Sequence, residues 1–318
     1  MTDFSFLIPA LNEEQYIGAC LESIHAHCPE GKSYEILVGD NGSTDDTKFV
    51  VEDFAERCLE ADVSFHDLRG CTVGGVRNLL AREANGPYYV FLDADTRLTP
   101  EWSVFVSSLT ERPHSAFVAG SRVVTPPEDK NNYLWRNWFK YLEGNQPKNY
   151  VNSGHMIMPA HVFNSLGGFD ANLVTGEDVD ICHRAVKHGY ALYVHPELLV
   201  YHDGYPRSTM NFFRRELWHG VGDFRDWSTF LESSPAKAGL VYMLWIFFGP
   251  FFMAVDPMLT VPWVASLVLI PLMVSMMREE KFMGKERWHH VYLTAVYLLA
   301  RGMSFLYRNE KRRFVEYR

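Results

Sequence analysis

Apolar and polar positions follow two different rhythms along the first two hundred residues. Short runs rich in aromatic and β-branched residues, typical of buried strands, alternate with longer segments of helical periodicity. The strand-like runs are residues 4–10, 34–40, 63–68 and 88–92. Strands that alternate with helices predict an α/β domain with a mostly parallel central sheet. Ligands in such sheets bind beyond the carboxyl ends of the strands.

Cap signals mark the expected helix starts. Asn12 with Gln15 has the spacing of a capping box, and Ser43 stands before the second helical segment. Asp178 stands before a helical segment over residues 179–188. We therefore expect Asn12, Ser43 and Asp178 to cap helices, whatever other role they have.

The last third of the chain has a different pattern. Residues 238–255 and 258–277 contain no charged side chain. A membrane-spanning helix needs about 20 apolar residues, so the two segments predict a helical hairpin in a membrane. Prolines within them also permit a shallow re-entrant hairpin, and two buried helices of a soluble bundle are the alternative. The flanking basic residues are Arg214, Arg215, Arg225 and Lys237 before the hairpin and Arg278, Lys281, Lys285 and Arg287 after it.

Basic residues on both flanks place both hairpin ends on the cytoplasmic side. Residues 289–307 form a third apolar stretch, which is either an interfacial helix or another span. The basic tail over 308–318 suits an anionic membrane surface or a solvated terminus equally well. We expect a catalytic domain over residues 1–230 and a membrane-associated helical region over 231–318, with the hairpin at about 238–278 and a further helix at about 289–307.

Composition narrows the function classes. The net charge is −9, which argues against a nucleic-acid partner. The five cysteines have no C-x-x-C spacing, so free thiols in a reducing compartment are expected. The N-terminus lacks the features of a signal peptide, which places the first domain in the cytosol.

Two carboxylates end the strand-like run over 88–92. Asp93 and Asp95 are separated by one residue, so in extended chain they point the same way. Two negative charges on one face are unfavourable unless a cation or a hydrogen-bonding ligand compensates them. The pair therefore predicts a ligand or metal site.

Several short motifs occur in a fixed order around this pair of aspartates. "PALNEE", "VGDNGSTDDT", "GGVRN", "FLDADT", "GGFD", "GEDVD" and a later histidine, His202, follow one another over about residues 4–225. Single motifs are weak, but the ordered set resembles family 2 glycosyltransferases, which have the A-type glycosyltransferase fold. No dinucleotide-binding glycine motif or P-loop competes with this interpretation.

The resemblance implies a nucleotide-sugar site. It places Asp40 at the base, Asp93 at the ribose or at the metal's water shell, and Arg77 near the diphosphate. Arg214 and Arg215 would close over the diphosphate, or form a basic patch near the membrane. The other residues implied at the donor site are Pro9, Ala10, Asn12 and Glu13.

The resemblance also implies a divalent cation, Mn²⁺ or Mg²⁺. Asp95 and His202 would bind it, with Asp93 close by and Asp203 as a substitute ligand. Carboxylate oxygens suit both ions, and an imidazole favours Mn²⁺. The metal would neutralise charge on the departing nucleoside diphosphate.

The acceptor side follows from the same resemblance. Asp178 corresponds to the catalytic base, with Glu177 as the second candidate, and single-step displacement would invert the anomeric centre. Asn152, Ser153 and Gly154 would sit in the acceptor pocket, with Trp218 stacked beside it. The chain has Arg-Glu-Leu-Trp at 215–218 where processive synthases have Gln-x-x-Arg-Trp, which favours transfer of a single sugar.

The sequence thus predicts a metal-dependent, inverting glycosyltransferase at the cytoplasmic face of a membrane. The donor is expected to be a UDP-sugar, and the membrane hairpin indicates a lipid-linked glycan or glycolipid acceptor. A polyprenyl-phosphate glycosyltransferase is the first alternative, although an intact base at Asp178 argues against it. A non-catalytic nucleotide-sugar-binding subunit of a membrane assembly is the second.

Overall fold

A computed structural model describes residues 2–110, 116–144, 150–278 and 286–307. The described chain divides into two compact units. Of the described residues, the first unit contains those within 2–129 and 143–205, and the second contains those within 130–142 and 206–307. Residues 206–230 thus pack with the C-terminal helices. The expected end of the catalytic domain near residue 230 stays a prediction. Lys281, Lys285 and the basic tail over 308–318 lie outside the described residues.

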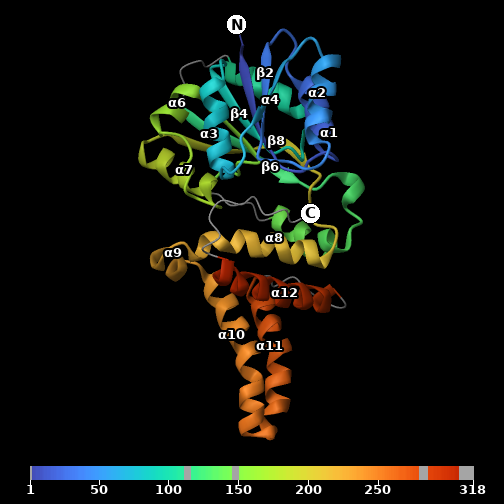
Figure 1. The fold of residues 1–318 in the computed structure, drawn as a ribbon, viewed down its shortest axis with the longest axis vertical. Helices are drawn as coiled ribbons and strands as arrows, with labels where there is room; N and C mark the ends of the chain where they lie inside the picture. The colour runs from blue at the N-terminus through green and yellow to red at the C-terminus, as the bar shows by residue number, and fades with distance from the viewer. Residues whose placement is uncertain (1, 111–115, 145–149, 279–285, 308–318) are drawn as a thin grey trace. The chain divides into compact units, whose positions relative to one another are not determined.

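The first unit is built on an eight-stranded sheet in the order β3-β2-β1-β4-β7-β6-β8-β5 (Figure 1). The strands β3, β2, β1 and β4 are parallel, as predicted, and β6 runs parallel to β8. β7 runs antiparallel to β4 and β6, and β5 runs antiparallel to β8. The strand bounds are β1 Phe4–Ala10, β2 Tyr34–Asp40, β3 Asp62–Asp67, β4 Tyr88–Leu92, β5 Thr96–Leu98, β6 Phe117–Val124, β7 His155–Pro159 and β8 Ala191–His202.

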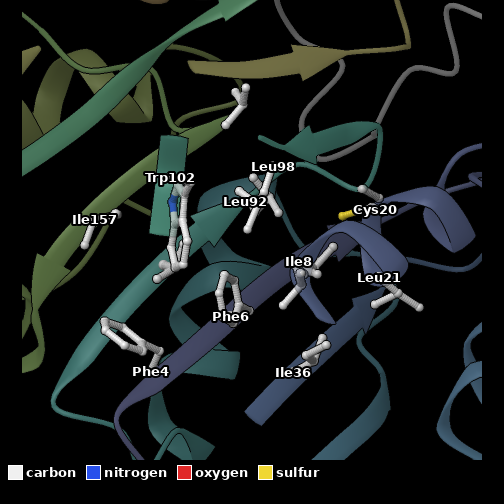
Figure 2. Packing of buried hydrophobic residues seen from close by; sticks show 14 of the residues in the cluster. Phe4, Phe6, Ile8, Cys20, Leu21, Ile36, Leu92, Leu98, Trp102 and Ile157 are labelled. Carbon is white, nitrogen blue, oxygen red and sulfur yellow. The ribbon is translucent and has the colours of Figure 1, made fainter. Parts of the chain in front are cut away.

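Helices accompany this sheet, and two hydrophobic clusters form the core of the unit. In the first cluster Phe4 and Phe6 of β1 pack against Trp102 of α4, with Phe6 and Trp102 centroids 5.5 Å apart (Figure 2). The helix bounds in this unit are α1 Ile17–His27, α2 Thr47–Arg57, α3 Val73–Glu83, α4 Pro100–Thr110, α6 Ala160–Ser165 and α7 Glu177–Lys187. A π-helix over Trp135–Phe139 leads into α5 (Lys140–Gly144), where the chain passes between the units.

All three capping predictions are wrong. α1 starts at Ile17 and α2 at Thr47, several residues after Asn12 and Ser43. Asn12 adopts φ 55°, and its side chain accepts from the Thr44 N–H at 2.8 Å. α7 starts at Glu177 after Gly176, so Asp178 lies in its first turn. Asn12 and Ser43 bind each other's loops, and Asp178 accepts from the Val179 N–H within α7. A local cap signal reveals neither arrangement.

The second unit is helical. Its bounds are α8 Thr209–Val221, α9 Trp227–Glu232, α10 Ser234–Val255, α11 Thr260–Arg278 and α12 Glu286–Tyr307. α10 and α11 form the expected hairpin, and α8 and α12 lie side by side across one end of it (Figure 1). Two segments, Ser234–Val255 and Pro257–Met277, are long and apolar enough to cross a membrane, judged by length and composition. Only 24% and 11% of their most apolar windows are buried, which disfavours two core helices of a soluble bundle.

Arg301 interrupts the third apolar stretch for a structural reason. Its Nη1 lies 3.0 Å from Asp223 Oδ2, and its Nε lies 3.6 Å from Glu216 Oε2 of α8. α12 is buried along one face and is not among the span-length segments. This arrangement favours the interfacial-helix interpretation of residues 289–307.

α10 and α12 cross at a pair of glycines. A Cβ on Gly302 would lie 2.3 Å from the Gly239 backbone oxygen, so the two backbones touch. We expect Gly302→Ala to destabilise the second unit by about 1–3 kcal/mol, the usual effect of overpacking. The change is measured as the shift in thermal unfolding of the detergent-solubilised protein. Alanine stabilises an unobstructed helix by about 1 kcal/mol relative to glycine, so a stabilised variant would contradict this packing.

Candidate functional site

The predicted donor residues gather where β1 and β2 end. Pro9 and Ala10 close β1 in register with Gly39 and Asp40 of β2. The buried Asp40 carboxylate accepts from the Gly42 N–H at 3.0 Å and from the Ser43 N–H and hydroxyl. Asp40 therefore shapes the loop after β2, and its contact with a base stays a prediction.

The loops after β1 and β2 are tied to each other. The Asn12 N–H donates to Ser43 Oγ at 2.8 Å, and the Glu13 N–H donates to Thr47 Oγ1 at 2.8 Å. The Thr44 N–H returns a bond to Asn12 Oδ1. Reciprocal bonds of this kind fix two loops as one preorganised surface, which suits binding of a nucleotide.

Asp93 lies directly after β4 and forms an ion pair. Its Oδ1 is 2.6 Å from Arg77 Nη2, and its side chain is 36% exposed. Arg77 Nη1 lies 2.8 Å from Glu177 Oε1, and the Ser153 hydroxyl donates to the same oxygen at 3.0 Å. The structure therefore brings together residues predicted for the donor side and the acceptor side.

Gly154 allows the predicted acceptor loop to approach Asp93. A Cβ on Gly154 would lie 2.8 Å from both Asp93 Oδ2 and Asn152 Oδ1. Asn152 Oδ1 also accepts from the Gly154 N–H at 2.7 Å. The loop over 152–154 thus lies against the carboxylate that follows β4, and a larger residue at 154 would force the Asp93 or Asn152 side chain to shift.

Asp95 and His202 meet as predicted. Asp95 Oδ2 lies 3.2 Å from His202 Nε2, and the two are held by the pairing of β5 with β8. A buried carboxylate oxygen and an imidazole nitrogen are both Mn²⁺ ligands, so this pair fits a divalent cation. Among the described residues no group of three or more His, Cys, Asp or Glu side chains could hold a metal by itself. Diphosphate oxygens would complete the coordination shell.

Asp203, the substitute ligand, is held elsewhere. Its two carboxylate oxygens accept from Arg97 Nε at 2.7 Å and Arg97 Nη2 at 2.9 Å. Sequence reasoning missed Arg97, which follows Asp95 by two residues. Its partner is distant along the chain, and only the pairing of β5 with β8 brings the two together.

Asp178 lies beside Glu177 in the first turn of α7 and is half-buried. One of its oxygens accepts from the Val179 N–H at 2.8 Å. Burial, together with the neighbouring Glu177 carboxylate, raises the pKa of Asp178 to about 7. A carboxylate with a pKa near neutrality is well suited to take up a proton from a substrate.

Glu177 differs from its neighbour, because it is buried and bound to Arg77 and Ser153. Arg214, Arg215 and Trp218 belong to α8 of the second unit. Within that unit Arg214 is exposed, whereas Arg215 pairs with Glu216 and lies over the Phe139 ring. A role for these three residues at the reaction centre stays a prediction.

Comparisons with known proteins identify the family. The family model described as "Glycosyl transferase family 2" matches residues 5–167, and "Glycosyl transferase family group 2" matches residues 88–300. The glycosyltransferase AglE of Haloferax volcanii is 24% identical over 77% of this chain and 80% of its own. A second relative, from Methanococcus voltae, is 24% identical over 90% of this chain and 89% of its own. Its name is dolichyl N-acetyl-alpha-D-glucosaminyl phosphate 3-beta-D-2,3-diacetamido-2,3-dideoxy-beta-D-glucuronosyltransferase.

A solved structure is similar in fold. It is the mannosyltransferase PcManGT of Pyrobaculum calidifontis, in complex with GDP-Man and Mn²⁺. The likeness covers 96% of this chain and 87% of that one, with a TM-score of 0.59 and 18% identity. The fold is therefore the A-type glycosyltransferase fold with a helical C-terminal appendage. The chain belongs to glycosyltransferase family 2.

Proposed function

We propose that this glycosyltransferase moves one sugar from a nucleotide diphosphate sugar, a UDP-sugar in our expectation, to a hydroxyl of a lipid-linked glycan or glycolipid. The transfer inverts the anomeric centre and depends on a divalent cation. The observation that carries the proposal is the raised pKa of Asp178. Asp178 lies beside Glu177, whose buried carboxylate is already paired with Arg77.

Asp178 takes the proton of the acceptor hydroxyl as that oxygen attacks the anomeric carbon. Glu177 does not take this role, because Arg77 and Ser153 hold it. Arg77 binds Asp93 through Oδ1, and the Asp93 side chain is 36% exposed, so its other oxygen can accept from a ribose hydroxyl. The loop over 152–154 lies next to Asp93 through Gly154 and next to Glu177 through Ser153, and it positions the acceptor.

Asp95 and His202 are the residues that would hold the cation. The bound cation supplies positive charge that stabilises the leaving nucleoside diphosphate. Their positions are set by the β5–β8 pairing and by the Asp203 N–H, which donates to the Asp95 backbone oxygen at 2.8 Å.

A lipid-linked acceptor is supported by the second unit. The α10–α11 hairpin exposes large apolar side chains along its length, which suits lipid better than water. α12 adds Trp288, Tyr292 and Leu306, all at least half exposed and spaced to fall on one helix face. Tryptophan and tyrosine favour the membrane–water interface. A membrane-held enzyme meets a lipid acceptor at a raised effective concentration.

Charged side chains on the hairpin should release the protein from the membrane. Phe247 is 66% exposed and Val268 is 46% exposed. We expect Phe247→Lys with Val268→Lys to turn a carbonate-resistant membrane protein into an extractable one, because each charge costs about 3 kcal/mol at a helix centre. Glu232→Lys on α9 is the matched control, since it adds a lysine outside the hairpin. Unchanged extraction of the hairpin variant would contradict a membrane role for α10 and α11.

The donor is identified by measuring nucleoside diphosphate release from a panel of nucleotide sugars. The purified protein is assayed in detergent with Mn²⁺ or EDTA, with and without a membrane-lipid extract. We expect release from one donor that requires the metal and is accelerated by the extract. Nucleotide binding without turnover of any donor would instead support a non-catalytic binding subunit.

A further inference from the structure

Arg77 is almost completely buried within the first unit. It is 1% exposed, and its guanidinium lies 5.7 Å from the Phe169 ring centroid. Both terminal nitrogens are bound to carboxylates, Nη2 to Asp93 at 2.6 Å and Nη1 to Glu177 at 2.8 Å. The Nε atom is buried and has no hydrogen-bond partner. Because the side chain is almost completely buried and both terminal nitrogens are paired with carboxylates, it presents almost no surface to a diphosphate.

The two carboxylates belong to different halves of the reaction centre. Asp93 follows β4 on the donor side, and Glu177 opens α7, next to the proposed base Asp178. Arg77 comes from α3, so one side chain of a third element links the other two. Nη2 also approaches the backbone oxygen of Ser153 at 3.5 Å, which adds the acceptor loop to the same centre.

We propose that Arg77 is a positioning residue that sets the distance between the donor-side Asp93 and the acceptor-side α7, and that it does not contact the diphosphate. The inference rests on the proposed function, since it assigns Asp93 and Asp178 to the two substrates. An arginine suits this role because its planar fork carries two donors in fixed geometry, whereas lysine presents a single ammonium group. Misplacement of reacting groups by about 1 Å lowers rates about 100-fold.

The charge of Arg77 also affects the proposed base. The Arg77 guanidinium lies between the Asp93 and Glu177 carboxylates and compensates the negative charge of both. The Glu177 carboxylate stands beside Asp178 and raises the pKa of Asp178, whereas Arg77 lowers it. Removing the Arg77 guanidinium should therefore raise the pKa of Asp178 and move the acid limb of the pH–rate profile to higher pH.

The test is a double-mutant cycle on kcat, with Arg77→Lys, Arg77→Met and Glu177→Gln in the full-length protein. We expect Arg77→Met and Glu177→Gln each to lower kcat about 100-fold and the double variant to lower it little further, since groups that act as one unit are not additive. The acid limb of Arg77→Met should lie at higher pH. Arg184→Lys is the matched control, because Arg184 pairs with Asp180 on the outer part of α7.

Nucleotide binding distinguishes positioning from direct contact. Affinities of each variant are measured for uridine and guanosine mono- and diphosphates, and we expect Arg77→Lys to leave the ratio of diphosphate to monophosphate affinity unchanged. Two results would overturn the proposal. One is a loss of affinity for the diphosphates but not for the monophosphates; the other is a kcat of the double variant that is lowered by the product of the two single losses. If Arg77→Met does not fold, Arg77→Lys completes the cycle with the charge retained. A wild-type protein that transfers no sugar would sink the proposed function, while the affinity ratio would still report on Arg77.

Discussion

Asp178→Asn is expected to lower kcat for transfer to a hydroxyl acceptor about 10³-fold while leaving nucleotide affinity almost unchanged. General-base catalysis typically contributes about 10²–10⁴-fold, and the amide cannot accept the acceptor's proton. The side chain keeps its shape, so the Val179 N–H retains an acceptor oxygen. Initial rates and calorimetric nucleotide binding on the same preparation measure the two effects separately.

Asp180→Asn is the matched control for this variant. Asp180 lies one half-turn further along α7 and pairs with Arg184, so its substitution should leave kcat within a few fold. Activity that survives Asp178→Asn would point to an acceptor that is already an anion. That outcome would favour the polyprenyl-phosphate transferase alternative, in which no hydroxyl has to be deprotonated.

The same residue sets the expected pH dependence. The pKa of Asp178 is raised to about 7 because of burial and the neighbouring Glu177 carboxylate. Below that pH the carboxyl is protonated and cannot act as a base, so kcat/KM should rise as the pH increases through about 7. A profile that is flat between pH 5 and 8 would remove Asp178 from the role of base.

Asp95→Ala should have the second large effect, a loss of metal-dependent turnover. Asp95 is 3% exposed and supplies the carboxylate that faces His202 at 3.2 Å. Without it a cation would keep a single protein ligand at this place, and the leaving diphosphate would lose its charge compensation. We expect turnover to fall at least about 10³-fold and the Mn²⁺-dependent gain in nucleotide affinity to disappear.

Asp67→Asn is the control for Asp95→Ala. Asp67 also ends a parallel strand, but it is exposed and pairs with Arg69. It should leave the metal dependence unchanged. Retained Mn²⁺ dependence in Asp95→Ala would place the metal elsewhere in the protein.

The sequence predicted what depends on local pattern. The four parallel strands from β1 to β4 match the strand-like runs. β1, β2 and β4 are buried almost throughout, whereas β3 at the sheet edge is only partly buried. The short β5 strand was missed, since three residues after Asp95 carry no period of their own and are paired only through β8.

In the site, too, residue identities could be predicted from the sequence, whereas contacts between distant residues could not. Asp95 and His202 were named from the family resemblance, and the structure places them together. The resemblance put Arg77 near the diphosphate, whereas the fold gives it two carboxylate partners from β4 and α7. Those partners lie 16 and 100 residues away along the chain, so no spacing rule could have shown that one guanidinium binds both.

The glycosidic product tests the central claim most directly. The donor identified by the panel is incubated with the wild-type protein, Mn²⁺ and the lipid acceptor, and the product is analysed by mass spectrometry and by NMR of the new anomeric centre. We predict one added sugar per acceptor, joined through a hydroxyl, with the configuration opposite to that in the donor. A retained configuration, a sugar on the lipid phosphate, or free sugar alone would contradict the account.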